Sequence, residues 1–391
     1  MKKIVKSFLL FIISSLILID CGGGGGGSSS SEEPPVVQLP NFNVDTWPGN
    51  TWQVVDPVRA NMDNFKLQQA LDYAFVENRN TQAVVVIRHG VIVAEKYSDD
   101  KNRFSLATSW STAKSFTSAL IGMVIDQGLI SSVDDKACLY LSDWDCDEVV
   151  CLSLDCPKLR SEISIRDLLE MRSGLEDESV GGLSIYSSVD DQLFFALNRL
   201  AVKTRGTEFL YSNSDSMILS GILETATGMT VKELAERDLF STIGMTGDWW
   251  SDKEGNTMTY CCIDATSRDF ARFGLLFARN GMWEDTQVIT QEWVNESTSP
   301  AEGLSYYGLH WWVYPVSMVS SGKTNMFAAQ GLHTNDIWIN QSLDLVVVRN
   351  SDFTRYGTDS IRTGSNIHST NPPDSWNNTE FLSFITESIN Q

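Results

Sequence analysis

Positive charge is scarce in this chain. Its 29 Lys and Arg residues stand against 50 Asp and Glu residues, which gives a formal net charge of −21 at pH 7. Proteins bind the phosphates of nucleic acids mainly through Lys and Arg, so this balance argues against a nucleic-acid partner. Long apolar runs are missing too: nothing after residue 20 is long and apolar enough to span a bilayer.

Metal-binding patterns are also missing. Six of the seven cysteines follow Cys21, and they are Cys138, Cys146, Cys151, Cys156, Cys261 and Cys262. None forms a Cys-x-x-Cys pair, and no histidine lies near the first four, so we predict no metal site. In an exported chain, one or two disulfides closing a surface loop are expected instead. Cys261 and Cys262 either form a vicinal disulfide or pair elsewhere.

The N-terminus has the pattern of an export signal. Three lysines precede the apolar residues 8–19, and Cys21 then opens a Gly/Ser tract. This arrangement resembles a bacterial lipoprotein signal, which implies that Cys21 is lipidated, although Asp20 replaces the usual small residue. An ordinary signal peptide or an uncleaved anchor is the alternative. We therefore expect an exported protein, anchored by lipid and facing the periplasm or cell surface.

The rest of the chain divides simply. We expect residues 1–20 to be the signal peptide, 21–50 a flexible tether and linker, and 51–391 one folded domain. Strand-like runs occur near both ends of this domain, at 83–88, 91–97, 308–313, 326–331, 337–340 and 345–349. Helical spacing lies mostly between them, at 65–75, 111–125, 166–171, 215–227 and 267–278. This order predicts an α+β fold, in which an antiparallel sheet built from both chain ends is flanked by helices, with a mainly helical region inserted at about 115–245.

Ser111 and Lys114 are the first candidates for chemistry. A serine hydroxyl needs a base to become a nucleophile, and a lysine one helical turn later can supply it. Two other Ser-x-x-Lys matches, starting at Ser98 and Ser320, lie in loop-like sequence. Only Ser111 opens a long apolar helix, where burial favours the neutral amine of Lys114 and the helix start adds N–H donors. The alternative is that Ser111 is an N-cap and Lys114 a structural side chain.

Tyr211-Ser212-Asn213 adds a second motif. Together with Ser-x-x-Lys, it resembles the Tyr-x-Asn element of class C β-lactamases, related esterases and 6-aminohexanoate-dimer hydrolases. The resemblance implies that Tyr211 exchanges a proton with Ser111 and the leaving group, and that Asn213 contacts the lysine and the substrate. Tyr211 alone would equally suit a capping or core tyrosine.

Two further stretches, residues 165–175 and 264–274, also resemble this family. The similarity extends over about residues 82–348 and implies a β-lactamase/DD-peptidase-like fold. One element differs from the family pattern: where the family carries Lys-Thr-Gly, this chain has Ala329-Gln330-Gly331. Lys323 begins a rival match in a turn-like segment, which we discount. In the family this lysine engages the β-lactam carboxylate, so its replacement argues against strong β-lactamase activity.

The same strand supplies further expected site residues. We assign the N–H groups of Ser111 and Leu332 to the oxyanion, with Gly331 beside them. His333 either touches substrate or makes a structural hydrogen bond. The implied function is a serine hydrolase that cleaves an ester or amide of a small molecule through an acyl-enzyme, without metal or organic cofactor. Alternatives are a β-lactamase, a DD-peptidase or a penicillin- or peptidoglycan-binding sensor lipoprotein. Sequence does not set the oligomeric state.

Overall fold

The structure, a computed structural model, describes residues 46–77, 79–147, 160–179, 185, 189–314, 325–352 and 376–390. Cys21, Cys151, Cys156 and Lys323 lie outside these residues, as do the expected signal peptide and nearly all of the tether. Among the residues described, we find no helix with the length and apolar character that a membrane crossing requires.

A six-stranded antiparallel sheet in the order β2-β1-β11-β10-β9-β8 forms the centre of the fold. Its strands are β1 (Thr81–Arg88), β2 (Val91–Tyr97), β8 (Trp312–Tyr314), β9 (Met326–Gly331), β10 (Asn335–Asn340) and β11 (Leu345–Ser351). Strand β1 pairs directly with β11, with Val85 opposite Val348. The sheet is therefore built from both chain ends, as predicted.

The β1–β2 turn shows why the sequence folds this way locally. His89 and Gly90 have φ values of 52° and 74°, and Arg88 pairs with Val91 across them. A two-residue hairpin loop with positive φ at both positions matches the twist of the flanking strands. The predicted strands at 83–88 and 91–97 are thus joined as a hairpin.

The predicted strand at 308–313 is largely wrong, since β8 begins only at Trp312. Gly308 packs against the backbone carbonyls of Ser297 and Ser299, and His310 has a φ of 63°. A residue in the left-handed region cannot continue an extended strand. The chain therefore bends here before it joins the sheet.

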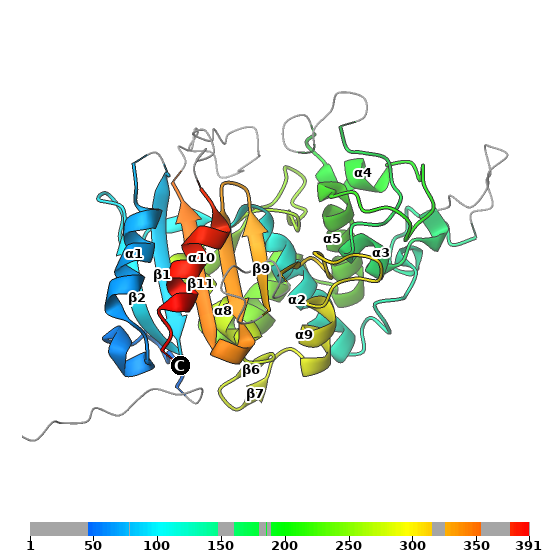
Figure 1. Ribbon diagram of the computed structural model, residues 1–391. Helices are drawn as coiled ribbons and strands as arrows, with labels where there is room; N and C mark the ends of the chain where they lie inside the picture. The colour runs from blue at the N-terminus through cyan, green and yellow to red at the C-terminus, as the bar shows by residue number, and fades with distance from the viewer. Residues whose placement is uncertain are drawn as a thin grey trace, which may run out of the picture. The chain divides into compact units, whose positions relative to one another are not determined.

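Helices cover both faces of the sheet (Figure 1). Helices α1 (Asn64–Ala74) and α10 (Asn378–Glu387) pack on one face, against alternate strand residues such as Val84 and Val347. Helix α8 (Ser267–Ala278) lies on the other face, where Val85 and Val348 belong to the larger core. Burial on both faces explains why these strands read as continuous apolar runs.

The remaining elements lie mainly between β2 and β8 in the sequence. The helices are α2 (Ala113–Asp126), α3 (Ile165–Leu169), α4 (Gln192–Leu197), α5 (Asn213–Thr227), α6 (Val231–Leu234), α7 (Ser241–Ile243) and α9 (Gln291–Ser297), with a π-helical stretch at Ala235–Phe240. Short 3₁₀ turns are η1 (Pro57–Ala60), η2 (Trp110–Thr112), η3 (Ala137–Leu139), η4 (Arg160–Glu162) and η7 (Gln341–Leu343). A small sheet joins β3 (Leu106–Thr108), β5 (Ile263–Thr266) and β4 (Gly247–Trp249), and β6 (Met282–Trp283) pairs with β7 (Thr286–Gln287).

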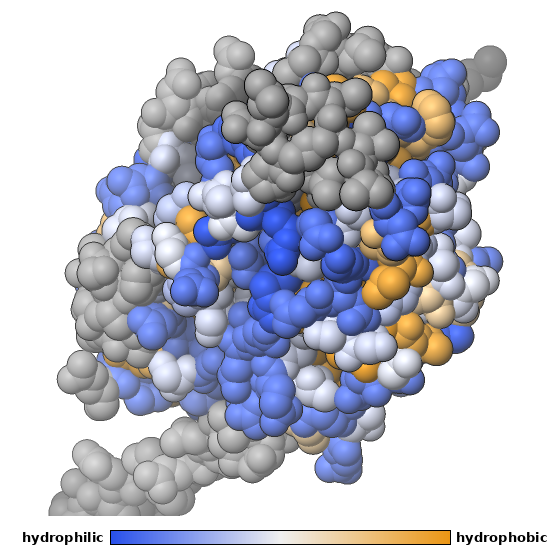
Figure 2. All heavy atoms as spheres, turned by 90° about the vertical axis from the view of Figure 1, so that its right-hand side faces the viewer, coloured by the Kyte–Doolittle hydropathy of each residue, from blue (hydrophilic) through white to orange (hydrophobic). Residues whose placement is uncertain are grey.

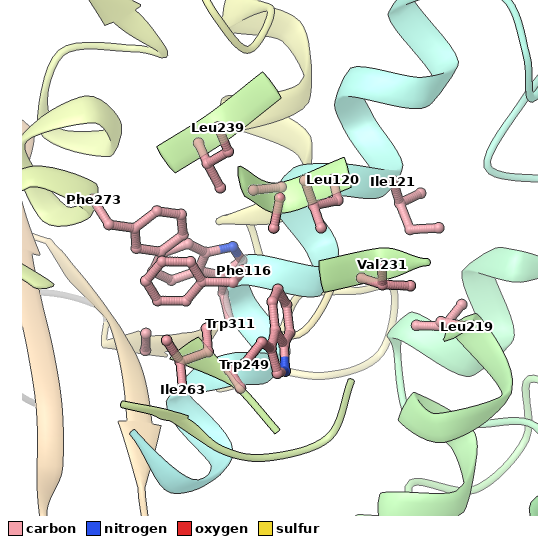
Figure 3. Close-up of a cluster of buried hydrophobic side chains, with 14 of the residues drawn as sticks. Phe116, Leu120, Ile121, Leu219, Val231, Leu239, Trp249, Ile263, Phe273 and Trp311 are labelled. Carbon is pink, nitrogen blue, oxygen red and sulfur yellow. The ribbon is translucent and has the colours of Figure 1, made fainter. Parts of the chain in front are cut away.

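The larger core is packed around α2 (Figure 3). Phe116 stacks on Phe273 with ring centroids 3.6 Å apart, and Phe273 stacks in turn on Trp311. The phenylalanines of α8 are thus core residues. The side of the molecule that carries α3 and α5 has a mainly hydrophilic surface with separate hydrophobic patches (Figure 2).

Two disulfides lie within the residues that the structure describes. Cys138 and Cys146 are joined across a short surface segment, with their Cα atoms 5.3 Å apart. This confirms the expectation of a disulfide-closed loop. Cys261 and Cys262 form a buried vicinal disulfide, which was one of the two alternatives left open by the sequence.

Candidate active site

Ser111 sits on a sharp turn between β3 and α2. Ser109 fixes the backbone before this turn, because its N–H donates to the Ile263 carbonyl at 2.8 Å and its Oγ accepts from the Ile263 N–H at 2.8 Å. Trp110 then adopts a φ of 51°, a conformation that is uncommon for a bulky residue. Such local strain is often concentrated at functional sites.

The turn corrects one detail of the prediction. Ser111 belongs to the 3₁₀ turn η2, and α2 begins only at Ala113. The left-handed Trp110 is the first residue of this 3₁₀ turn, which leads directly into α2. Thr112, not Ser111, occupies the N-cap position of α2. The alternative reading of Ser111 as a simple helix cap therefore has no support.

Ser111 is partly exposed, whereas its neighbours from Ala107 to Val124 are all buried. Helix α2 is held below it by the Phe116 cluster, so the position of the serine is fixed by the core. A reactive hydroxyl needs this combination of a rigid support and an open face.

Lys114 is buried directly beneath the serine, with 1% of its surface exposed. Its Nζ lies 3.1 Å from Ser111 Oγ, 2.7 Å from Asn213 Oδ1 and 2.9 Å from the Tyr260 carbonyl oxygen. Burial lowers the pKa of Lys114 from 10.5 to about 7, against the opposing effect of the Glu178 charge. A large fraction of the amine is therefore neutral near pH 7 and able to accept a proton.

Tyr211 completes the cluster from the segment before α5. It makes a side-chain hydrogen bond with Ser111, and its ring lies over Lys114 Nζ at 4.9 Å. Burial raises the pKa of Tyr211 to about 12, so the phenol is protonated at neutral pH. The ring packs against Trp312 and Tyr307, which fixes its direction.

Asn213 is held by a residue that sequence reasoning missed. Its Nδ2 donates to Glu178 Oε1 at 2.8 Å, while Oδ1 faces Lys114. Glu178 belongs to neither motif and lies 35 residues earlier. An isolated acidic residue in a polar loop gives no signal of such a contact. The Tyr260 carbonyl was likewise unpredictable, because a backbone acceptor leaves no trace in side-chain patterns.

Ser111, Tyr211 and Asn213 line a pocket of about 520 Å³. Its lining residues are Trp110, Ser111, Tyr211, Asn213, Trp312, Gln330, Gly331 and Leu332. The structure thus brings Ser111, Gly331 and Leu332 to the same pocket, although the end of β9 is far away in sequence. A Cβ on Gly331 would overlap the Ser109 carbonyl oxygen, so only glycine allows this close approach.

His333 lies beyond the end of β9 rather than among these lining residues. Its φ is 61°, its ring meets the edge of Trp110, and its carbonyl accepts from Arg349 at 2.6 Å. Burial lowers its pKa, with the Arg349 charge acting in the same direction. These contacts fix the backbone and ring of His333 at the end of β9, and both alternatives for its side chain stay predictions.

A second histidine, His310, is buried behind the site. Its ring Nε2 lies 3.1 Å from Ser216 Oγ, and its carbonyl accepts from Ser115 at 2.8 Å. Burial and the Lys114 charge lower its pKa to about 3, so it is neutral at ordinary pH. It links α2 to α5. No cluster of His, Cys, Asp or Glu that could hold a metal ion occurs in the described part of the chain.

Residues 74–361 match the Beta-lactamase family. The chain belongs to the Beta-lactamase family. A 6-aminohexanoate-dimer hydrolase of Paenarthrobacter ureafaciens is 22% identical over 315 residues, which cover 71% of this chain and 74% of that protein. These findings make the chain a member of a hydrolase family with the β-lactamase fold.

Solved structures of Beta-lactamase-like proteins share the fold. A Bacillus anthracis protein assigned as a 6-aminohexanoate-dimer hydrolase superposes with a TM-score of 0.63 at 20% identity, over 89% of this chain and 88% of that one. An octameric penicillin-binding protein homologue from Pyrococcus abyssi gives 0.58 at 17% identity, over 74% of each chain. The predicted α+β, β-lactamase-like fold is confirmed.

The end of strand β9 lies beside the serine and lines the same pocket. It carries Ala329 and Gln330, the residues that we matched from the sequence to the start of the Lys-Thr-Gly element. Ala329 is buried and points into the core, whereas Gln330 lines the pocket. Tyr314 donates to Gln330 Oε1 at 2.6 Å, and Gln330 Nε2 donates to Asp336 at 3.2 Å. The pocket wall is neutral at this point.

Proposed function

We propose that the protein is a serine hydrolase that cleaves an ester or amide bond through a covalent Ser111 acyl-enzyme. The observation that carries this proposal is the buried Lys114 amine, 3.1 Å from a partly exposed serine hydroxyl at the edge of a pocket. A serine becomes a nucleophile when a neighbouring base accepts its proton.

In the first step, neutral Lys114 accepts the Ser111 proton while Oγ attacks the carbonyl carbon. The resulting oxyanion is stabilised by the backbone N–H groups assigned to Ser111 and Leu332. In the second step, the bond to the leaving group breaks as that group takes a proton. Water then hydrolyses the acyl-enzyme and restores the serine hydroxyl.

Tyr211 serves as the proton relay to the leaving group. Because its pKa is raised to about 12, the free enzyme holds the phenol rather than the phenolate. Tyr211 can therefore donate its proton to the leaving group while Lys114 resupplies it. This division of roles gives Lys114 the first proton transfer and Tyr211 the second.

The described lining of the pocket has no cationic side chain that would pair with a carboxylate of the substrate. Its lining within the described residues is aromatic or apolar at Trp110, Trp312 and Leu332, and it contains no Lys or Arg. A carboxylate next to the scissile bond would meet no counter-charge there. This supports an esterase or an amidase of linear amides, as the name of the Paenarthrobacter relative suggests, over a β-lactamase or DD-peptidase.

A panel of chromogenic esters, the linear 6-aminohexanoate dimer and a chromogenic cephalosporin tests the proposal. We expect ester or amide hydrolysis by the wild type, and a loss of about 10³-fold or more in Ser111→Ala. Ser98→Ala removes the serine of a rival Ser-x-x-Lys match and should keep the wild-type rate. Equal rates in wild type and Ser111→Ala would contradict the assignment.

A sensor that is acylated without turnover remains the non-enzymatic competitor. The test separates the two, because a sensor would form a stable Ser111 adduct with a β-lactam and release no product. We also propose that lipidation of Cys21 holds the domain at a membrane outside the cytoplasm.

A further inference from the structure

Glu178 lies outside both sequence motifs, yet its carboxylate contacts the start of α5 at several points. Oε1 accepts from Asn213 Nδ2 at 2.8 Å. Oε2 accepts from the backbone N–H groups of Asn213 and Ser214, both at 3.0 Å, and from Ser214 Oγ at 3.3 Å. A carboxylate is well suited to this place, because the first N–H groups of a helix have no partner within the helix.

These contacts determine which way the Asn213 amide faces. An amide carries its acceptor and its two donors on different sides. With Nδ2 bound to Glu178, Oδ1 is directed at Lys114 Nζ, 2.7 Å away. A continuous chain of hydrogen bonds therefore runs from Glu178 through Asn213 and Lys114 to Ser111.

We propose that Glu178 is a positioning residue for acyl transfer. It holds the Asn213 amide so that the amide oxygen faces Lys114, and the negative charge of the Glu178 carboxylate stabilises the protonated form of that lysine. The inference rests on the proposed function, in which Lys114 is the base. A neutral glutamine at position 178 would have one acceptor oxygen for these three N–H donors, so it would hold the Asn213 amide less firmly.

The other groups around Lys114 do not replace this charge. The rings of Tyr211 and Tyr260 lie 4.9 and 5.7 Å from Nζ, and the Tyr260 carbonyl accepts from it. Burial keeps His310 neutral by lowering its pKa to about 3. Burial raises the pKa of Asp215 to about 7, so this carboxyl is partly ionised near neutral pH, and it accepts a hydrogen bond from Ser173. Glu178 acts to raise the pKa of Lys114, opposing the larger effect of burial.

The test is the rate of fluorophosphonate labelling of Ser111 as a function of pH in Glu178→Gln. Glutamine keeps the shape but offers one acceptor and one donor group. The plateau rate at high pH should fall at least about tenfold, because the lysine loses its oriented acceptor. The midpoint pH, at which the labelling rate reaches half of its plateau value, should be lower than in the wild type, since the charge that favoured protonated Lys114 is gone.

Glu176→Gln is the matched control. It makes the same chemical change two residues earlier, where the carboxylate pairs with Arg199 at 3.7 Å and does not touch Asn213. Its plateau and midpoint should equal those of the wild type. Thermal unfolding of each variant reports how much Glu178 stabilises α5, separately from its effect on the midpoint.

The outcomes separate the inference from the proposed function. A Glu178→Gln plateau and midpoint equal to the wild type would overturn the inference alone, as would a lower plateau with an unmoved midpoint, which indicates only structural support. If Glu178→Gln does not fold, Glu178→Asp is measured instead. Its retained charge should leave the midpoint pH unchanged, and its shorter side chain should lower the plateau rate. An unchanged plateau rate in Glu178→Asp would overturn the inference. Absence of labelling in the wild type would overturn the proposed function and the inference with it.

Discussion

Lys114 determines the pH range in which Ser111 can react. Its ammonium would be costly to bury without partners, and the structure provides two fixed oxygen acceptors, Asn213 Oδ1 and the Tyr260 carbonyl. Burial nevertheless dominates and lowers its pKa to about 7. The two forms of the amine are therefore both accessible near neutrality, as proton transfer in both directions requires.

This shift has a direct consequence for the pH profile. The neutral amine is the base, and its fraction grows as pH rises through the pKa of Lys114. We predict that Ser111 labelling increases about tenfold per pH unit below pH 7 and levels off above it. Stopped-time labelling between pH 5 and 9 measures this limb. A limb centred near pH 10 would mean that Lys114 has an ordinary pKa and is not the base.

At the residue scale, the sequence was informative where chemistry imposes a fixed spacing. Ser111 and Lys114 are three residues apart, and Tyr211 and Asn213 form a short motif, so both pairs could be found from the chain alone. Glu178 reaches Asn213 only through the fold. The orientation of the amide, and with it the role of Glu178, could not be read from any local pattern.

At the element scale, the end of β9 determines the shape of the pocket. Gly331 lies so close to the Ser109 carbonyl and Trp110 that a methyl group there must displace one of them. Leu332, the next residue, lines the same pocket as Ser111. The fit between β9 and the turn η2 is therefore the structural basis of the assigned oxyanion site.

Gly331→Ala tests this fit. We predict a loss of stability of about 1–3 kcal/mol from overpacking, and slower labelling of Ser111 because β9 is pushed away from the turn. Gly221→Ala in α5 is the control, since its methyl group would meet only the ends of Leu141 and Leu193 side chains. Wild-type labelling by Gly331→Ala would show that the close approach of β9 is unimportant for reactivity.

Regular elements were predictable where a turn or cap fixed their ends. The β1–β2 hairpin turns at His89 and Gly90, and α5 ends at Thr227 as predicted, before Gly228 with a φ of 67°. The start of α2 was placed two residues too early, because residues 111 and 112 belong to a 3₁₀ turn that side-chain spacing does not distinguish from an α-helix. The late start of β8 has its origin in the packing of Gly308 against distant carbonyls.

At the scale of the whole molecule, the two chain ends build one sheet, and the helices between them supply Lys114 and Asn213. Strand-like apolar runs near both ends of the domain, with helical segments between them, were enough to predict this arrangement. The substrate was not predictable, because the pocket is formed by residues from β9, η2 and the segment before α5, which meet only in the folded chain.

Attachment to a membrane is a prediction for the whole chain. We expect the wild-type protein to partition into a detergent phase and Cys21→Ala to partition into the aqueous phase, because the lipid on Cys21 is lost. Immunoblots of both phases after expression in a bacterial host measure this. Detergent partitioning by Cys21→Ala would instead indicate an uncleaved N-terminal anchor.

The central claim is that Ser111 is an activated nucleophile. Intact-mass spectrometry of the purified protein after treatment with a fluorophosphonate tests it most directly, since Ser111 Oγ would bond to phosphorus as fluoride leaves. The account predicts one adduct on the wild type and none on Ser111→Ala. An unmodified wild type, or an adduct that persists in Ser111→Ala, would contradict it.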